Sequence, residues 1–204
     1  MTSAIQTPTD LVNMSLRRIG YKLSVGSLYE GSEASAFALD IYAQTRDEFL
    51  RASDADFSEG NIALQLLKQA PDGGYVPPIT WSDAYPPLPW VFEYAYPDDC
   101  LKVRSIRPQA IFVMEFDPHP ITYSLSNDNS FTPAQKVLLC NTPSALLTYT
   151  RRVTDLTNWE PDSIEAFAAA LGRRLVPSLL GLDALKAVVP DEQNAVSTAE
   201  KNQG

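Results

Sequence analysis

Histidine and cysteine are scarce in this sequence, which narrows the chemistry that the chain can carry. The single histidine, His119, lies in the loop-like sequence D-P-H-P. A catalytic triad or a histidine metal site would have to use it, yet no serine elbow or glycine-rich phosphate loop accompanies it. The two cysteines, Cys100 and Cys140, have neither metal-site nor redox-pair spacing, so we expect free, buried thiols. We therefore predict no catalytic residue, no metal and no cofactor.

Long apolar runs and basic stripes are also missing. No apolar run approaches the ~20 residues that a membrane-spanning helix needs, and the first ten residues lack the basic and apolar regions of a signal peptide. We expect a protein made in a cytoplasm, with no membrane partner. The net charge of −9 argues against general phosphate binding. The doubled arginines, at positions 151–152 and 173–174, are better explained by ion pairs than by nucleic-acid contacts.

The overall composition is that of a globular protein. Hydrophobic residues make up 45% and charged residues 20% of 204 positions, enough for one large domain or two small ones. Sixteen prolines against nine glycines predict long, stiffened connections rather than tight hairpins. The longest of these, residues 69–90, is rich in proline and aromatic residues, and a loop of this length in a compact chain is usually functional or partly disordered.

Three helices are predicted, over residues 9–20, 32–51 and 161–181. The second has an apolar stripe at helical spacing that includes Phe37 and Tyr42, and we expect it to be the spine of the fold. The first two should pack as an antiparallel hairpin. In the third, Pro177 should kink or split the helix, because proline removes an amide donor and crowds the preceding turn.

Short segments rich in β-branched and aromatic residues predict strands between the second and third helices. The segment 61–68 is ambiguous between helix and strand, and we favour strand. The other candidates are residues 91–96, 101–106, 111–116, 121–125, 136–140 and 145–153. The sequence thus predicts an α+β fold: a helical bundle, made of an N-terminal helix hairpin plus a C-terminal helix, with an inserted small antiparallel β lobe and a flexible C-terminal tail. The expected division is 1–60 with 154–182, then 61–153, then 183–204.

Acidic residues give two weak signals for a site. Asp98 and Asp99 could form half of an acid/base pair, but Pro-Asp-Asp between strands is typical of a turn. Asp54, Asp56 and Glu59 could hold a cation, but they lack the glycine and the later glutamate of a calcium loop. The sequence therefore contains no strong signal of an enzyme.

Three stretches, taken together, resemble a known family. They are residues 19–51, 92–106 and 146–175, and their order and spacing are similar to those of the head-to-tail adaptor proteins of short-tailed bacteriophages, also called tail tubular protein A or head completion proteins. The positions that carry the resemblance are Gly20, Ser27, Leu28, Glu30, Tyr42, Arg46, Asp47, Tyr94, Pro97, Asp99, Cys100, Leu101, Tyr149, Asp155 and Pro161.

The resemblance implies a structural protein of the virion neck, assembled in the cytoplasm of the host bacterium. It implies a homo-oligomeric ring, expected to be a dodecamer, that binds beneath the portal protein and extends the DNA channel. A tail nozzle protein would bind the far side of the ring. Double-stranded DNA would pass through without specific binding, since the chain is acidic.

Interface residues are expected in two places. The aromatic side chains Trp81, Tyr85 and Trp90 of the proline-rich connection should lie against a neighbouring subunit or a tail partner. The C-terminal tail should dock on the portal, with the candidate residues Asp183, Leu185, Val188, Val189 and Val196. Two alternatives stay open: a small hydrolase that uses carboxylates with His119, and a carbohydrate-binding β module on a helical scaffold.

Overall fold

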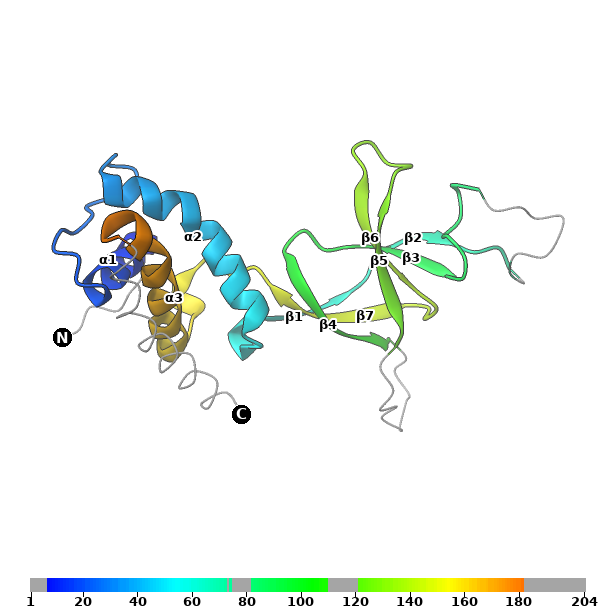
Figure 1. The fold of residues 1–204 in the computed structure, drawn as a ribbon. Helices are drawn as coiled ribbons and strands as arrows, with labels where there is room; N and C mark the ends of the chain where they lie inside the picture. The colour runs from blue at the N-terminus through cyan, green and yellow to red at the C-terminus, as the bar shows by residue number, and fades with distance from the viewer. Residues whose placement is uncertain (1–6, 73, 75–81, 110–120, 182–204) are drawn as a thin grey trace. The chain divides into compact units, whose positions relative to one another are not determined.

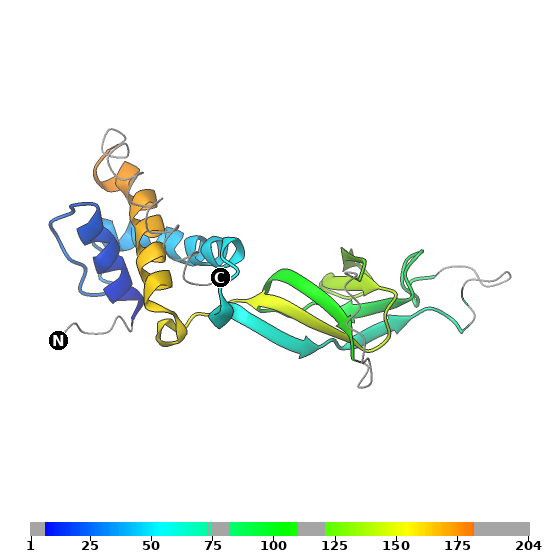
Figure 2. The same ribbon diagram turned by 90° about the horizontal axis from the view of Figure 1, so that it is seen from below.

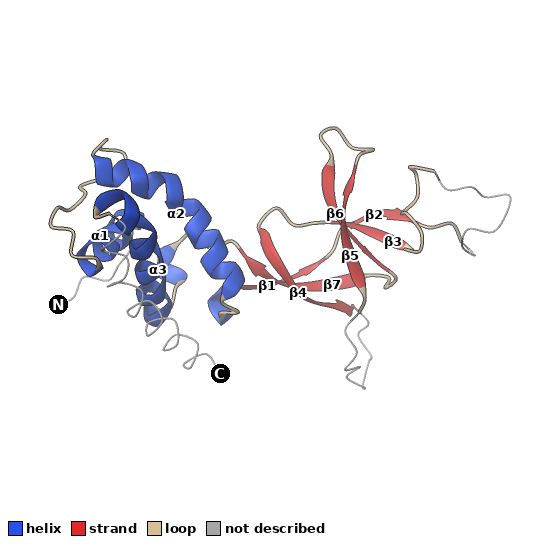
Figure 3. Cartoon of the chain, in the orientation of Figure 1, coloured by secondary structure: helices blue, strands red, loops and turns tan. Residues whose placement is uncertain are grey.

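The computed structural model describes residues 7–72, 74, 82–109 and 121–181, and these form two compact units. A helical unit combines residues 1–58 with the chain from position 152 onward, and a β unit spans Glu59–Arg151. Each unit is described by itself. Figure 3 distinguishes the helices of the first unit from the strands of the second.

The helical unit contains α1 (Pro8–Arg18), α2 (Glu33–Ala52) and α3 (Pro161–Leu179), with short 3₁₀ helices at Asp56–Ser58 and Leu156–Asn158. Local sequence accounts for where the α-helices begin. Thr7 and Asp10 form a reciprocal capping box at the start of α1, and Ser32 accepts a hydrogen bond from the Ser35 amide at the start of α2. Pro161 occupies the first turn of α3, where its missing amide costs nothing.

The central helix is α3, and the predictions of an α2 spine and an antiparallel α1–α2 hairpin are wrong. Helix α3 packs against both α1 and α2, which have little direct contact with each other. Figures 1 and 2 both show α3 beside α1. Small buried residues such as Ala166, Ala169 and Gly172 on α3 allow close approach, whereas Phe37 of the expected α2 stripe is 36% exposed.

Pro177 was predicted to kink or split α3, and the split is wrong because the helix continues through Pro177 to Leu179. The helix ends two residues later, at Leu179, and the amide of Leu180 still donates to the carbonyl of Val176 at 2.8 Å. Proline in the last turn removes only one hydrogen bond close to the helix end.

The β unit contains two antiparallel sheets. One has the order β1-β7-β4, formed by β1 (Glu59–Ala63), β7 (Ala145–Arg151) and β4 (Cys100–Pro108). The other has the order β2-β3-β6-β5, formed by β2 (Leu66–Gln69), β3 (Phe92–Ala95), β6 (Gln135–Cys140) and β5 (Tyr123–Asp128).

These two sheets overturn the predicted fold class, a helical bundle with a small inserted β lobe. Strands make up about 26% of the described residues and form sheets of three and four strands. The segment 61–68 explains part of the difference, since it supplies strands to both sheets: the amide of Leu64 donates to Ala145 of one sheet, and the carbonyl of Gln65 accepts from Ala95 of the other. The predicted strand 111–116 lies outside the described residues.

Side chains from both sheets form the core of the β unit. Tyr94 and Leu138 from the four-stranded sheet cluster with Ile106, Leu147 and Tyr149 from the three-stranded sheet. Both cysteines, Cys100 and Cys140, belong to this cluster and are free and buried, which confirms that prediction. Because strand side chains alternate, residues between these core positions point to the opposite face of the four-stranded sheet. That face carries the site described next.

Candidate functional site

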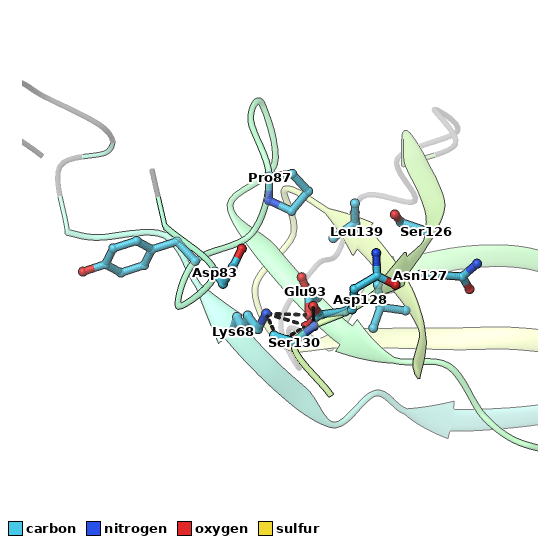
Figure 4. A pocket seen from close by; sticks show the side chains of 12 residues that line it. Lys68, Asp83, Pro87, Glu93, Ser126, Asn127, Asp128, Ser130 and Leu139 are labelled. Atoms are coloured by element: carbon cyan, nitrogen blue, oxygen red, sulfur yellow. Dashed lines mark hydrogen bonds and ion pairs between the residues drawn. The ribbon is translucent and has the colours of Figure 1, made fainter. Parts of the chain in front are cut away.

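A hollow of about 280 Å³ lies on the outer face of the four-stranded sheet (Figure 4). The strands contribute its floor, and the segment before β3 contributes one wall. Its described lining residues are Lys68, Asp83, Tyr85, Pro87, Glu93, Ser126, Asn127, Asp128, Asn129, Ser130, Val137 and Leu139. A charged cluster, made of Lys68, Glu93, Asp128 and Ser130, occupies this hollow; Glu93 is buried, Lys68 and Asp128 are half-buried, and Ser130 is exposed.

Lys68 is the hub of the charged cluster. Its ammonium pairs with the Asp128 carboxylate, donates to Ser130 Oγ at 2.9 Å, and lies 3.8 Å from Glu93 Oε1. Asp128 in turn accepts hydrogen bonds from the amide of Ser130 at 2.9 Å and from its hydroxyl at 3.0 Å. Lys68 lies on β2 and Asp128 on β5, which are the two edges of this sheet. The cluster therefore joins one edge of the sheet to the other.

The two carboxyl groups of the cluster are shifted in opposite directions. Burial, followed by a hydrogen bond with Asp128, raises the pKa of Glu93 to about 7. Burial also acts on Asp128, but hydrogen bonds from Lys68 and Ser130 outweigh it and lower the pKa of Asp128 to about 2. One ammonium thus faces two carboxyl groups, and the Glu93 side chain, 2% exposed, retains a proton into the neutral range.

Two carboxyl groups with separated pKa values are what general acid/base catalysis requires. Here, however, both are engaged with each other and with Lys68, and Glu93 is almost inaccessible to solvent. The contacts favour a structural role for Lys68 and Asp128, which hold the edges of the sheet. Sequence reasoning missed all three residues, although a glutamate between two aromatic residues in F-E-Y-A was a signal of a buried acid.

The stability of the β unit should depend on pH through Glu93. Its pKa is 4.5 in ordinary surroundings and about 7 in the folded chain, so folding takes up a proton between these values. The free energy of unfolding should therefore fall as the pH rises from 4.5 to 7 and level off above that. Glu93→Gln should remove this slope and raise stability at pH 8 by about 1–3 kcal/mol relative to the wild type. Urea denaturation at several pH values measures this, and parallel curves for both proteins would contradict it.

The acids singled out from the sequence have structural roles. Asp99 accepts a hydrogen bond from the hydroxyl of Tyr149 at 3.1 Å. Burial and this neighbouring carboxylate raise the pKa of Tyr149 to about 12. The turn before β4 is thereby joined to the centre of the three-stranded sheet, which fits the turn interpretation of Asp98 and Asp99.

The structure gives no support to a cation site at Asp54, Asp56 and Glu59. Within residues 7–72, 82–109 and 121–181, no three acidic, histidine or cysteine side chains are grouped so as to hold a metal ion. Asp56 begins a 3₁₀ helix, and Glu59 pairs with Arg104 at 3.2 Å.

One arginine of each doubled pair forms an ion pair, in line with the predicted surface role. Arg152 donates to Asp47 at 2.8 Å, and Arg174 pairs with Glu48 and donates to Thr45 at 3.2 Å. These contacts connect α3 and the segment before it to α2. They stabilise the helical unit and form no basic stripe.

Of the predicted interface residues, only Tyr85 and Trp90 lie within the described part of the chain. Tyr85 and Trp90 are half-buried. Trp81, His119 and the tail candidates Asp183, Leu185, Val188, Val189 and Val196 lie outside the described residues. Exposed apolar side chains occur on both units, however, and the sequence pattern did not mark them as a group: Leu23, Tyr29, Phe37, Leu39 and Leu180 on the helical unit, and Ile62, Leu66, Leu88, Val91, Tyr123 and Leu125 on the β unit.

Comparisons with known proteins assign no family to the chain: no protein-family model matches it, and no curated protein matches it. Among the described helices, none is long and apolar enough to cross a membrane.

Proposed function

We propose that this chain is a structural connector of a bacteriophage neck. In this proposal it forms a homo-oligomeric ring beneath the portal protein, extends the DNA channel, and gives the tail nozzle protein its docking platform. The observation that carries the proposal is the ordered sequence resemblance to head-to-tail adaptors, which extends over both units and falls on residues that define the fold.

Glu30 illustrates this in the helical unit. Its carboxylate accepts hydrogen bonds from the amides of Gly26 at 2.7 Å and Ser27 at 3.2 Å, and from the hydroxyl of Ser32 at 2.6 Å. These bonds lower the pKa of Glu30 and shape the turn that leads into α2. The Ser-Leu-x-Glu sequence therefore works as a folding motif, with Leu28 buried beside it.

Two other motif residues, Asp47 and Asp155, also form contacts that define the fold. Asp47 accepts from both Arg46 and Arg152, so it joins α2 to the chain that returns from the β unit. Asp155 caps the 3₁₀ helix before α3 by accepting from Thr157. A shared set of fold-defining residues supports a shared fold, and the fold supports the same role.

Two further features fit a protein that acts through interfaces. Large apolar side chains are exposed on both units, where they are available for contacts with partner proteins. The net charge of −9 disfavours tight binding of duplex DNA, as a channel for passing DNA requires. The hydrolase alternative gains no support from Asp99, which Tyr149 engages.

Deleting residues 183–204 should abolish binding to the portal while leaving the fold intact. Its first part, residues 183–189, has a short apolar strip and the rest is polar, so the segment has too little apolar area to offset the ordering entropy of about 1–2 kcal/mol per residue unless a partner contributes surface. Co-sedimentation with portal rings, together with circular dichroism of the truncated chain, measures both effects. A truncated chain that sediments with portals as well as the full chain does would remove the docking role from this segment.

A further inference from the structure

The hollow on the four-stranded sheet has an unbalanced charge. Its described lining includes one cation, Lys68, and three carboxyl groups, those of Asp83, Glu93 and Asp128. Lys68 and Asp128 neutralise each other by direct contact. Glu93 shares this ammonium with Asp128 and lies 3.8 Å from it, whereas Asp83 is exposed. The two acids come from different sides of the hollow: Glu93 from its floor on β3, and Asp83 from the segment that forms its wall (Figure 4).

Glu93 also has an unused acceptor. Its Oε1 atom is buried and accepts no hydrogen bond from any residue that the structure describes, although the side chain is only 2% exposed. The nearest cationic atom, Lys68 Nζ at 3.8 Å, is beyond hydrogen-bonding distance and is engaged by Asp128 and Ser130. Buried acceptors in folded proteins nearly always have a partner, so this atom points to a donor that the described residues do not supply.

We propose that the hollow is a binding site for a guanidinium group, with the exposed Asp83 as its first carboxylate partner and Glu93 as its second, reached when the buried Glu93 side chain turns toward the hollow. A guanidinium fits better than an ammonium for two reasons. Its planar fork can donate to two acceptors at once, and its weak hydration makes partial burial less costly. The asparagine side chains at the rim, Asn127 and Asn129, offer further carbonyl acceptors.

The protonation of Glu93 is consistent with this assignment. Without a second cation, burial and the neighbouring Asp128 raise the pKa of Glu93 to about 7, so a proton takes the place of the missing charge. The charged groups around Glu93 are Lys68 on β2, Asp128 on β5 and Asp83 on the covering segment. A bound guanidinium would favour the carboxylate form, and binding would release the proton.

Titration of the full chain with ethylguanidinium chloride, followed by NMR, tests the site. We expect saturable shifts confined to resonances of residues that line the hollow, with an affinity at about pH 8 roughly tenfold higher than at about pH 6 because Glu93 must lose its proton. Calorimetry near pH 6 in two buffers of different ionisation enthalpy should show release of about one proton on binding.

Variants separate the site from general ionic effects. Glu93→Gln should remove the pH dependence, and Asp83→Asn, an exposed substitution compatible with folding, should weaken binding about tenfold. Asp72→Asn, exposed in the same unit but outside the hollow, should change neither. The proposal would be overturned if sodium chloride produced the same resonance shifts, or if Glu93→Gln and Asp83→Asn both left binding unchanged. Either result would leave the proposed connector role untouched.

The same reagent identifies the source of the guanidinium. If the natural donor is an arginine of another copy of this chain, ethylguanidinium should dissociate self-assembled chains in sedimentation experiments. If self-association is unaffected while binding persists, the guanidinium comes from a molecule other than a copy of this chain. Both results support the site, and the connector role is tested separately by portal binding.

Discussion

Replacing Lys68 by methionine should lower the free energy of unfolding of the β unit by about 3–5 kcal/mol at neutral pH. The lysine and Asp128 side chains are each 12% exposed, so removing the ammonium leaves a half-buried carboxylate without its counter-ion beside the buried Glu93 carboxyl group. The loss of stability should be larger than the loss of the hydrogen bond to Ser130 alone would cause, because the partly desolvated Asp128 carboxylate remains without a counter-ion. Hydrogen exchange of amides in β2, β3 and β6 would assign the loss to this sheet.

Lys136→Met is the matched control for that experiment. Lys136 is exposed in the same sheet, and its ammonium lies 3.8 Å from the centre of the Tyr96 ring. An exposed contact of this kind is worth about 0.5–1 kcal/mol. Equal losses in the two variants would show that the charged cluster has no special role in holding the edges of the sheet together.

The second large effect is expected in the helical unit, where Phe167→Ala should cost about 3–5 kcal/mol. Phe167 on α3 is fully buried, and three aromatic rings surround it: Tyr42 edge-on at 5.6 Å, Phe49 at 5.5 Å and Trp159 at 5.3 Å. Truncation leaves a cavity among rigid rings that cannot easily collapse. Urea denaturation followed by tryptophan fluorescence measures the effect, since Trp159 lies against the substituted ring.

Phe37→Ala on α2 is the control, because this ring is 36% exposed. It should cost less than about 1 kcal/mol, in line with surface substitutions. If Phe37→Ala were as destabilising as Phe167→Ala, the assignment of α3 as the central helix would be wrong. The comparison therefore tests the correction that the structure made to the sequence-based interpretation of this unit.

The positions of the helices could be predicted from the sequence, but their packing could not. Capping residues such as Thr7 and Ser32, and proline at the first turn of α1 and α3, act locally and are visible in the sequence. The central helix is the one that neighbouring helices bury on several sides, and this depends on the packing of the whole unit. Small residues such as Ala166 and Gly172 give a weak periodic signal, yet they allow α3 to contact two partners.

The β unit was harder to predict because strand pairing is non-local. Residues 61–68 are short and weakly patterned, and their division into β1 and β2 depends on partners far along the chain, Leu146 and Tyr94 among them. Pairing of this kind is set by tertiary packing, whereas turn and capping residues act locally. This is why a two-sheet unit was underestimated as a small lobe.

The charged cluster was missed for a similar reason. Lys68, Glu93 and Asp128 lie on three strands, and only the sheet order brings their side chains together. The sequence offered one clue, an acid between two aromatic residues on β3, which alternation places on the face opposite the core. By contrast, Asp99 was recognisable as a turn residue, because Pro-Asp-Asp has local conformational preferences.

Cryo-electron microscopy of the full chain mixed with the portal protein of the same virus tests the connector role most directly. The proposal predicts a closed ring of copies of this chain bound coaxially beneath the portal, with the DNA channel continuing through the ring. Portal particles without added density, at concentrations where the chain is folded and in excess, would contradict it.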